Sequence, residues 1–141
     1  MSCLCGSDLD LDKCCARFID NNEQPQTAEE LMRSRYVAYA QIKMDYIAKT
    51  HDPKTSKDND MDANREWAEK TKWLGLEIVR TEGGQSGDEE GIVEFNAKYD
   101  SGEGIKTHSE VSTFRKHKGK WFFIDSKSPE SRTFVREGAK I

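Results

Sequence analysis

The chain has 141 residues, of which 35% are hydrophobic and 34% charged, and its formal net charge is −4. This length suits one globular domain with a small additional module, and so few apolar residues allow only a modest core. The negative charge argues against general nucleic-acid binding, which depends on Lys and Arg side chains that neutralise phosphates. No apolar stretch approaches the ~20 residues of a membrane span, and the N-terminus lacks the basic start and apolar run of a secretion signal. We therefore expect a cytoplasmic protein with no membrane contact.

All four cysteines lie within the first fifteen residues, at Cys3, Cys5, Cys14 and Cys15. Four thiolates can complete the tetrahedral shell of a structural Zn²⁺ ion, with bonds of about 2.3 Å and no open position for a catalytic water. Disulfides are rare in a reducing cytoplasm, and a bridge between the adjacent Cys14 and Cys15 would be strained. Reduced thiols with redox chemistry and other metals remain as alternatives. We interpret residues 1–20 as a zinc knuckle, in which Gly6 and Ser7 turn the backbone so that N–H groups face sulfur.

A helical pattern follows the polar connector at residues 20–26. Thr27 and Glu30 have the spacing of a capping box, in which each side chain binds a backbone N–H group of the first turn. Apolar residues then recur at steps of three and four as far as Pro53, which predicts one long helix or two helices joined near Gln41.

The charged run 52–62 is expected to be a loop. Asp58, Asp60 and Asp62 partly match a calcium-binding loop, but Ala63 stands where such a loop needs Gly. A solvated helix start, favoured by the helix dipole, is the better interpretation. The buried side of this second helix is expected to consist of Trp67, Trp73 and Leu74.

From Leu76 onward the hydrophobic pattern alternates, as in strands with one buried face, and Val93, Phe95, Ala97 and Tyr99 are expected to share that face. Strands are expected near 76–82, 91–99, 107–116 and 120–126, with a hairpin turn at 117–120. Short connections favour an antiparallel meander, so helices followed by strands predict an α+β domain over residues 27–126. Residues 127–141 are expected to form a polar tail.

The pattern Cys-x-Cys-Gly-Ser, six residues and then Cys-Cys resembles the SEC-C motif, the small zinc-binding module named for the C-terminus of the SecA translocation ATPase. The remaining chain resembles the bacterial YchJ-like family of uncharacterised proteins, in Leu31 to Tyr36, Trp73 to Leu76, Gly91 to Tyr99 and Gly119 to Asp125. The resemblance implies a nuclear-transport-factor-2-like fold, in which a curved antiparallel sheet wrapped by helices forms a cone with a pocket. The acidic spacer Asp8 to Asp12 departs from the basic spacer usual in SEC-C motifs, and a second SEC-C copy is absent from the last fifteen residues.

A cone pocket would suit polar side chains that act as acid and base on a small molecule. The candidates are Arg33, Arg35, Tyr36, Asp45, Glu110 and Ser112, which could equally form structural ion pairs and line the core. No Ser/His/Asp order, phosphate loop or helical histidine pair is present, and the three histidines, His51, His108 and His117, look isolated. We therefore favour a zinc-binding protein-interaction or small-ligand-binding module over an enzyme of proton transfer or hydrolysis. The expected partners are an unidentified protein bound through the knuckle and a second copy of the chain bound through an exposed sheet face.

Overall fold

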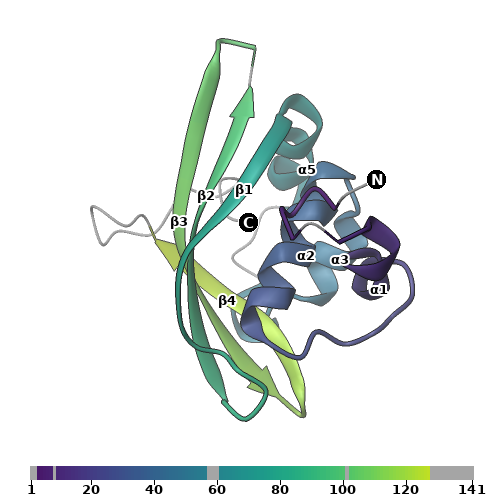
Figure 1. The fold of residues 1–141 in the computed structure, drawn as a ribbon, viewed down its shortest axis with the longest axis vertical. Helices are drawn as coiled ribbons and strands as arrows, with labels where there is room; N and C mark the ends of the chain where they lie inside the picture. The colour runs from purple at the N-terminus through teal and green to yellow at the C-terminus, as the bar shows by residue number, and fades with distance from the viewer. Residues whose placement is uncertain (1–2, 8, 57–60, 101, 128–141) are drawn as a thin grey trace.

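The structure is a computed structural model that describes residues 3–7, 9–56, 61–100 and 102–127. Helices occupy the first half of the chain and a four-stranded sheet the second. The helices cover one face of the curved sheet, and the N-terminal cysteine segment lies against the helical layer (Figure 1). This arrangement confirms the α+β class. No helix among the described residues is long and apolar enough to cross a membrane.

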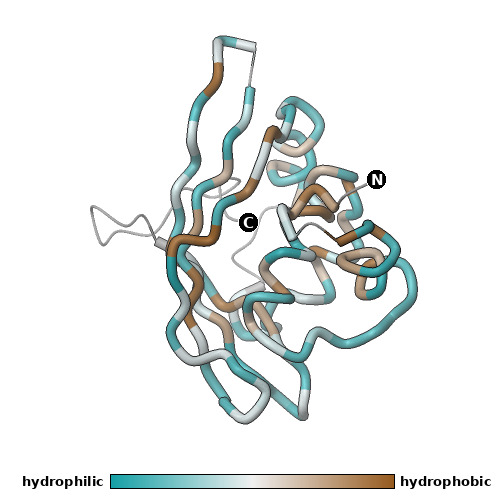
Figure 2. The backbone as a smooth tube through the Cα atoms, in the orientation of Figure 1, coloured by the Kyte–Doolittle hydropathy of each residue, from teal (hydrophilic) through white to brown (hydrophobic). Residues whose placement is uncertain are grey.

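The sheet is an antiparallel meander in the order β1-β2-β3-β4. Its strands are β1 (Lys72–Gly83), β2 (Glu90–Asp100), β3 (Ile105–His117) and β4 (Lys120–Lys127). Hydrophilic and hydrophobic positions alternate along these strands (Figure 2), and Val93, Phe95 and Ala97 are fully buried as predicted. At the predicted hairpin turn, Lys118 and Gly119 have φ angles of 53° and 80°, a pair of positive values that suits a tight turn between right-twisted strands.

The predicted break near Gln41 is present, so the first helical region consists of α2 (Ala28–Ala40) and α3 (Met44–Lys49). Thr27 caps α2, because its Oγ1 accepts a hydrogen bond from the Glu30 N–H at 3.1 Å. The Glu30 carboxylate accepts from the N–H of Gln26 at 2.7 Å, so it satisfies a donor one residue before the cap.

The prediction of a loop across residues 52–62 is wrong at both of its ends. A short helix, α4 (Pro53–Ser56), follows Asp52, and α5 (Met61–Lys70) begins one residue before the predicted loop ends. The Asp52 carboxylate starts α4, since its Oδ1 accepts from the Lys54 N–H at 2.9 Å. Asp58 and Asp60 lie outside the described residues.

The assignment of Trp73 and Leu74 to the second helix is also wrong, because α5 ends at Lys70 and both residues belong to β1. Trp73 pairs with Tyr99 across the sheet and packs edge-on against Trp67 of α5, with ring centroids 5.1 Å apart. Leu74 sits at an irregularity of the β1–β2 register and is 45% exposed. The indole of Trp73 therefore belongs to the sheet and packs against α5, the helix to which the sequence pattern had assigned it.

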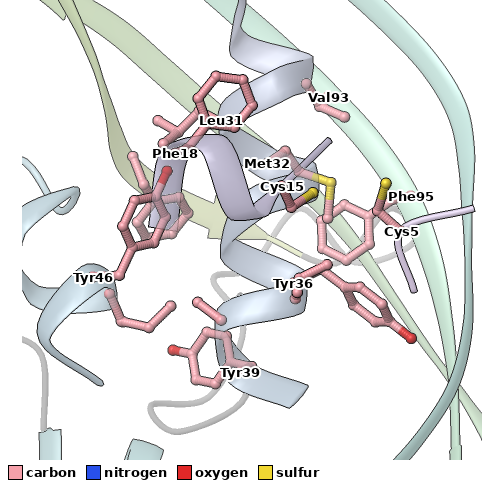
Figure 3. Packing of buried hydrophobic residues seen from close by; sticks show 14 of the residues in the cluster. Cys5, Cys15, Phe18, Leu31, Met32, Tyr36, Tyr39, Tyr46, Val93 and Phe95 are labelled. Atoms are coloured by element: carbon pink, nitrogen blue, oxygen red, sulfur yellow. The ribbon is translucent and has the colours of Figure 1, made fainter. Parts of the chain in front are cut away.

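The core lies between α2 and the inner face of the sheet. Leu31, Met32 and Val37 of α2 are completely buried, as are Val93 and Phe95 of β2. Figure 3 shows Cys5 and Cys15 of the N-terminal segment beside Met32 and Phe95. Apolar burial of this kind supplies most of the stability of a small domain.

Candidate metal centre and cone interior

The cysteine segment is a compact loop that leads into two short helical turns, η1 (Leu11–Lys13) and α1 (Ala16–Ile19). The Cys3 N–H donates to the Leu9 carbonyl at 2.7 Å, and the Gly6 N–H donates to the Cys3 carbonyl at 3.2 Å. Gly6 has a φ of 83°, and a side chain there would also meet the Leu76 carbonyl of β1 at 3.2 Å. Glycine therefore allows both the turn and its close approach to the sheet.

The four sulfur atoms converge, all lying within 4.8 Å of one another. The Cys5 and Cys14 sulfurs are 3.5 Å apart, and the Cys14 and Cys15 sulfurs 3.8 Å apart. Tetrahedral zinc with bonds of about 2.3 Å would place its ligands ~3.8 Å apart. All four cysteines are buried and carry free thiols. The donor set and its spacing therefore fit a closed thiolate metal site.

The prediction that backbone N–H groups face the sulfurs stays a prediction, but a polar side chain does reach one of them. The turn residue Ser7 contributes its side chain, whose Oγ lies 3.0 Å from the Cys14 sulfur. Such contacts orient ligands around a metal.

Close packing also gives the thiols different pKa values. A hydrogen bond with the Cys15 thiol lowers the pKa of Cys5 to about 4. The same hydrogen bond, followed by burial, raises the pKa of Cys15 well above its usual range, and burial raises the pKa of Cys3. The Cys5 thiol is thus readily ionised while those of Cys3 and Cys15 resist ionisation, and a bound cation would favour the thiolate form of all four.

Two arginines bind the backbone of the cysteine segment, Arg33 from α2 and Arg17 from α1. Arg33 of α2, a predicted pocket residue, donates from Nη1 to the Cys5 carbonyl at 2.5 Å and from Nε to Glu29 at 2.9 Å. Arg17 donates from Nε to the Cys14 carbonyl at 3.1 Å. Arg33 therefore lies at the four-cysteine cluster rather than in the cone interior.

The other pocket candidates separate into two groups. Asp45 is exposed on α3 and lines a surface hollow of about 360 Å³ beside Lys43 and Arg65. Tyr36 is buried edge-on against Trp73, with ring centroids 5.6 Å apart, and burial raises its pKa to about 12. Neither residue belongs to the buried polar group around Glu110.

Glu110 and Ser112 of β3 are completely buried on the helix-facing side of the sheet. The Ser112 hydroxyl donates to Glu110 Oε2 at 2.5 Å, and His108 Nε2 lies 2.8 Å from Oε1. Arg35 is buried nearby and donates from Nη1 to the Ile47 carbonyl at 3.0 Å and to Thr50 Oγ1 at 2.6 Å. Burial lowers the pKa of Arg35, and the charge of Glu110 opposes that effect.

The sequence interpretation missed His108, which it treated as isolated. Residues two apart on a strand share a face, so the pattern His108-x-Glu110-x-Ser112 already contained the signal.

A four-cysteine module fused to a helix-covered antiparallel sheet defines the class of this protein, and the comparisons with known proteins agree. The sequence profile described as "YchJ, middle NTF2-like domain" matches residues 27–126. The chain belongs to this YchJ-like family. A UPF0225 protein of Geobacter sulfurreducens is 44% identical over 123 residues, covering 87% of this chain and 76% of that protein. Another from Actinobacillus succinogenes is 42% identical over 124 residues, covering 88% and 80%.

Two solved structures have the same architecture. The solution structure of a SEC-C motif containing protein from Rhodopseudomonas palustris has a TM-score of 0.84 and 36% identity, covering 92% of this chain and all of that chain. The crystal structure of a SEC-C motif containing protein from Psychrobacter arcticus has a TM-score of 0.77 and 31% identity, covering 96% and 85%.

Proposed function

We propose that the cysteine cluster binds Zn²⁺ in a structural site and that the protein is a cytoplasmic interaction or small-ligand-binding module. The observation that carries the metal assignment is the convergence of four buried sulfurs within 4.8 Å. Because protein thiolates would fill all four positions, the metal would stabilise structure and would not activate water.

The position of the cluster supports this role. Its four cysteines belong to the same buried cluster as Met32, Tyr36 and Phe95, as Figure 3 shows for Cys5 and Cys15. The metal would therefore hold the segment against α2 and the sheet. Such a fixed segment is suited to presenting a rigid surface to a partner.

The outer surface of the segment supports binding of a protein partner. Leu4 is 49% exposed and Leu9 51% exposed, and both lie in the same short segment as the exposed Asp10 and Asp12. Apolar side chains exposed beside acidic ones favour a partner that offers apolar and basic residues. The partner surface of this proposal therefore consists of Leu4, Leu9, Asp10 and Asp12.

Metal analysis tests the first half of the proposal. Protein purified without chelator is expected to contain Zn²⁺ equimolar with the chain, and Cys14→Ser is expected to lose it. Lys13→Gln is a matched control, because Lys13 is exposed in the same segment and supplies no thiol. Metal-free native protein would contradict the assignment.

A pull-down from lysate tests the second half. The double variant Leu4→Ser, Leu9→Ser is expected to keep its zinc and lose a protein that the native chain retains. Equal capture by both forms would exclude this surface while leaving the zinc assignment intact.

A further inference from the structure

Three polar side chains, those of His108, Glu110 and Ser112, follow one another on the helix-facing side of β3. His108, Glu110 and Ser112 lie opposite the buried residues Ala97, Phe95 and Val93 of β2. Glu110 is completely buried, and a carboxylate at such a position costs several kcal/mol unless its oxygens are hydrogen-bonded. Here both oxygens are, one by His108 at 2.8 Å and one by Ser112 at 2.5 Å.

The order of these contacts separates the roles of the three residues. The carboxylate stands in the middle, so the Ser112 hydroxyl donates to it and is not activated as a nucleophile by the histidine. An ionised carboxylate only accepts hydrogen bonds, which places the imidazole hydrogen on His108 Nε2. The lone pair is then on Nδ1, which forms no hydrogen bond with any residue in the described part of the chain. A carboxylate that fixes the tautomer in this way prepares an imidazole to accept a proton.

His108 lies at the border between the core and solvent. Its side chain is 12% exposed, whereas that of Glu110 is fully buried. The imidazole packs edge-on against Trp67 of α5, with centroids 5.5 Å apart, and at 6.4 Å from Phe95. Trp67 is itself only partly buried, so an aromatic surface adjoins the imidazole where α5 faces β3.

We propose that His108, oriented by Glu110, accepts a proton from a small planar organic molecule that bears an acidic O–H group and packs against Trp67. This inference is independent of the metal centre. The aromatic surface selects a planar, uncharged ligand, and the free imidazole nitrogen selects a hydrogen-bond donor. Phenols combine these two properties.

The transfer is a simple acid–base step. The ligand O–H bond breaks, its electron pair stays on oxygen, and the proton forms an N–H bond at Nδ1 of His108. The resulting imidazolium is stabilised by the Glu110 carboxylate at Nε2, and the proton returns when the ligand leaves. No oxidant, reductant or metal takes part.

Titration of para-nitrophenol with the native protein tests this inference, because the probe changes colour when its proton is removed. At a pH where the free probe is protonated, we expect a saturable rise of the phenolate band. His108→Gln should abolish the rise, and Glu110→Gln should weaken it by at least about tenfold, the loss typical of a charged hydrogen bond. Trp67→Leu should weaken binding of the probe.

His117→Gln is the matched control, since His117 is exposed at the β3–β4 turn and should leave the titration unchanged. Circular dichroism would verify that each variant is folded, and His108→Gln carries the test if the buried Glu110→Gln change prevents folding. The proposal is overturned if native protein gives no saturable change, or if His108→Gln behaves like native protein. Either result would assign the His108, Glu110 and Ser112 contacts to stability alone.

Discussion

Arg33 donates from Nη1 to the carbonyl oxygen of Cys5 at 2.5 Å, although 28 positions separate the two residues in the chain. The same guanidinium donates from Nε to Glu29, a neighbouring residue of α2, at 2.9 Å. This contact fixes the orientation of the Arg33 side chain towards the cysteine segment. Helix α2 therefore holds the backbone of Cys5, a proposed metal ligand, in place. Fixed partners of ligating residues commonly alter metal affinity by about 10- to 100-fold.

Arg33→Gln is expected to speed the loss of zinc by about tenfold, because the Cys5 carbonyl would lose its charged donor. Transfer of zinc to a coloured chelator measures the rate. Arg65→Gln, at an exposed position of α5, is the control for loss of a positive charge. Equal rates for the two variants would show that Arg33 does not position the metal ligands.

Removal of zinc is expected to destabilise the whole domain and not only its first twenty residues. All four cysteines share one buried cluster with Leu31, Met32 and Phe95, so loosening them exposes part of the main core. We expect Tm to fall by roughly 10 °C, equivalent to about 3 kcal/mol for a domain of this size. Tryptophan fluorescence from Trp67, Trp73 and Trp121, measured during thermal unfolding, should shift together with the far-ultraviolet signal. If the temperature of the tryptophan transition is the same with and without metal, the cysteine segment unfolds independently of the rest of the domain.

The ion pair between Asp52 and Arg115 predicts a specific acid response. Asp52 has a side chain only 2% exposed, and that of Arg115 is 25% exposed. Burial would raise the pKa of Asp52, but the Arg115 guanidinium hydrogen-bonded to it outweighs burial and lowers the pKa below 3.8. Because the folded-state pKa is lowered, the stabilisation is complete above the unfolded-state value and is lost as pH falls through the folded-state value.

Asp52→Asn should therefore cost about 3 kcal/mol near neutral pH, as expected when a buried pair loses one partner. The difference from native protein should persist down to about pH 4 and shrink only below it. Urea unfolding of both proteins across this range measures the difference, and acid release of any bound metal would affect both alike. A difference that disappears well above pH 4 would show that another group controls the response.

Sequence patterns predicted elements whose signals are local. The alternation around Val93, Phe95 and Ala97 specified β2, and the Thr27 and Glu30 spacing specified the start of α2. The α5–β1 boundary was not predictable in this way, because Trp73 and Leu74 fit a helix face as well as a strand. Pairing of Trp73 with Tyr99 across the sheet decides between them.

In the candidate site, too, features with a local sequence signal were predictable and those set by tertiary packing were not. The cysteine cluster was predictable because its four members lie within fifteen residues, close enough for spacing alone to imply convergence. Arg33 was placed in the cone pocket because no sequence pattern shows that its guanidinium turns towards Cys5. Its partner is set by the packing of the cysteine segment on α2, a tertiary property.

The break between α2 and α3 offers a stabilising substitution. Ile42 has a φ of 58°, in the left-handed region that costs an ordinary residue about 1–2 kcal/mol and suits glycine. The backbone requires this turn, since the Lys43 N–H donates to the Ala38 carbonyl at 2.8 Å and ends α2. Ile42 is 36% exposed, so its removal also loses some apolar burial, which offsets part of the strain that is relieved. Ile42→Gly is expected to raise the free energy of unfolding by a net ~0.5 kcal/mol, whereas Ile42→Val should give no gain because valine meets the same strain. Chemical denaturation of the three proteins decides the matter, and destabilisation by glycine would mean that the packing of Ile42 outweighs its backbone strain.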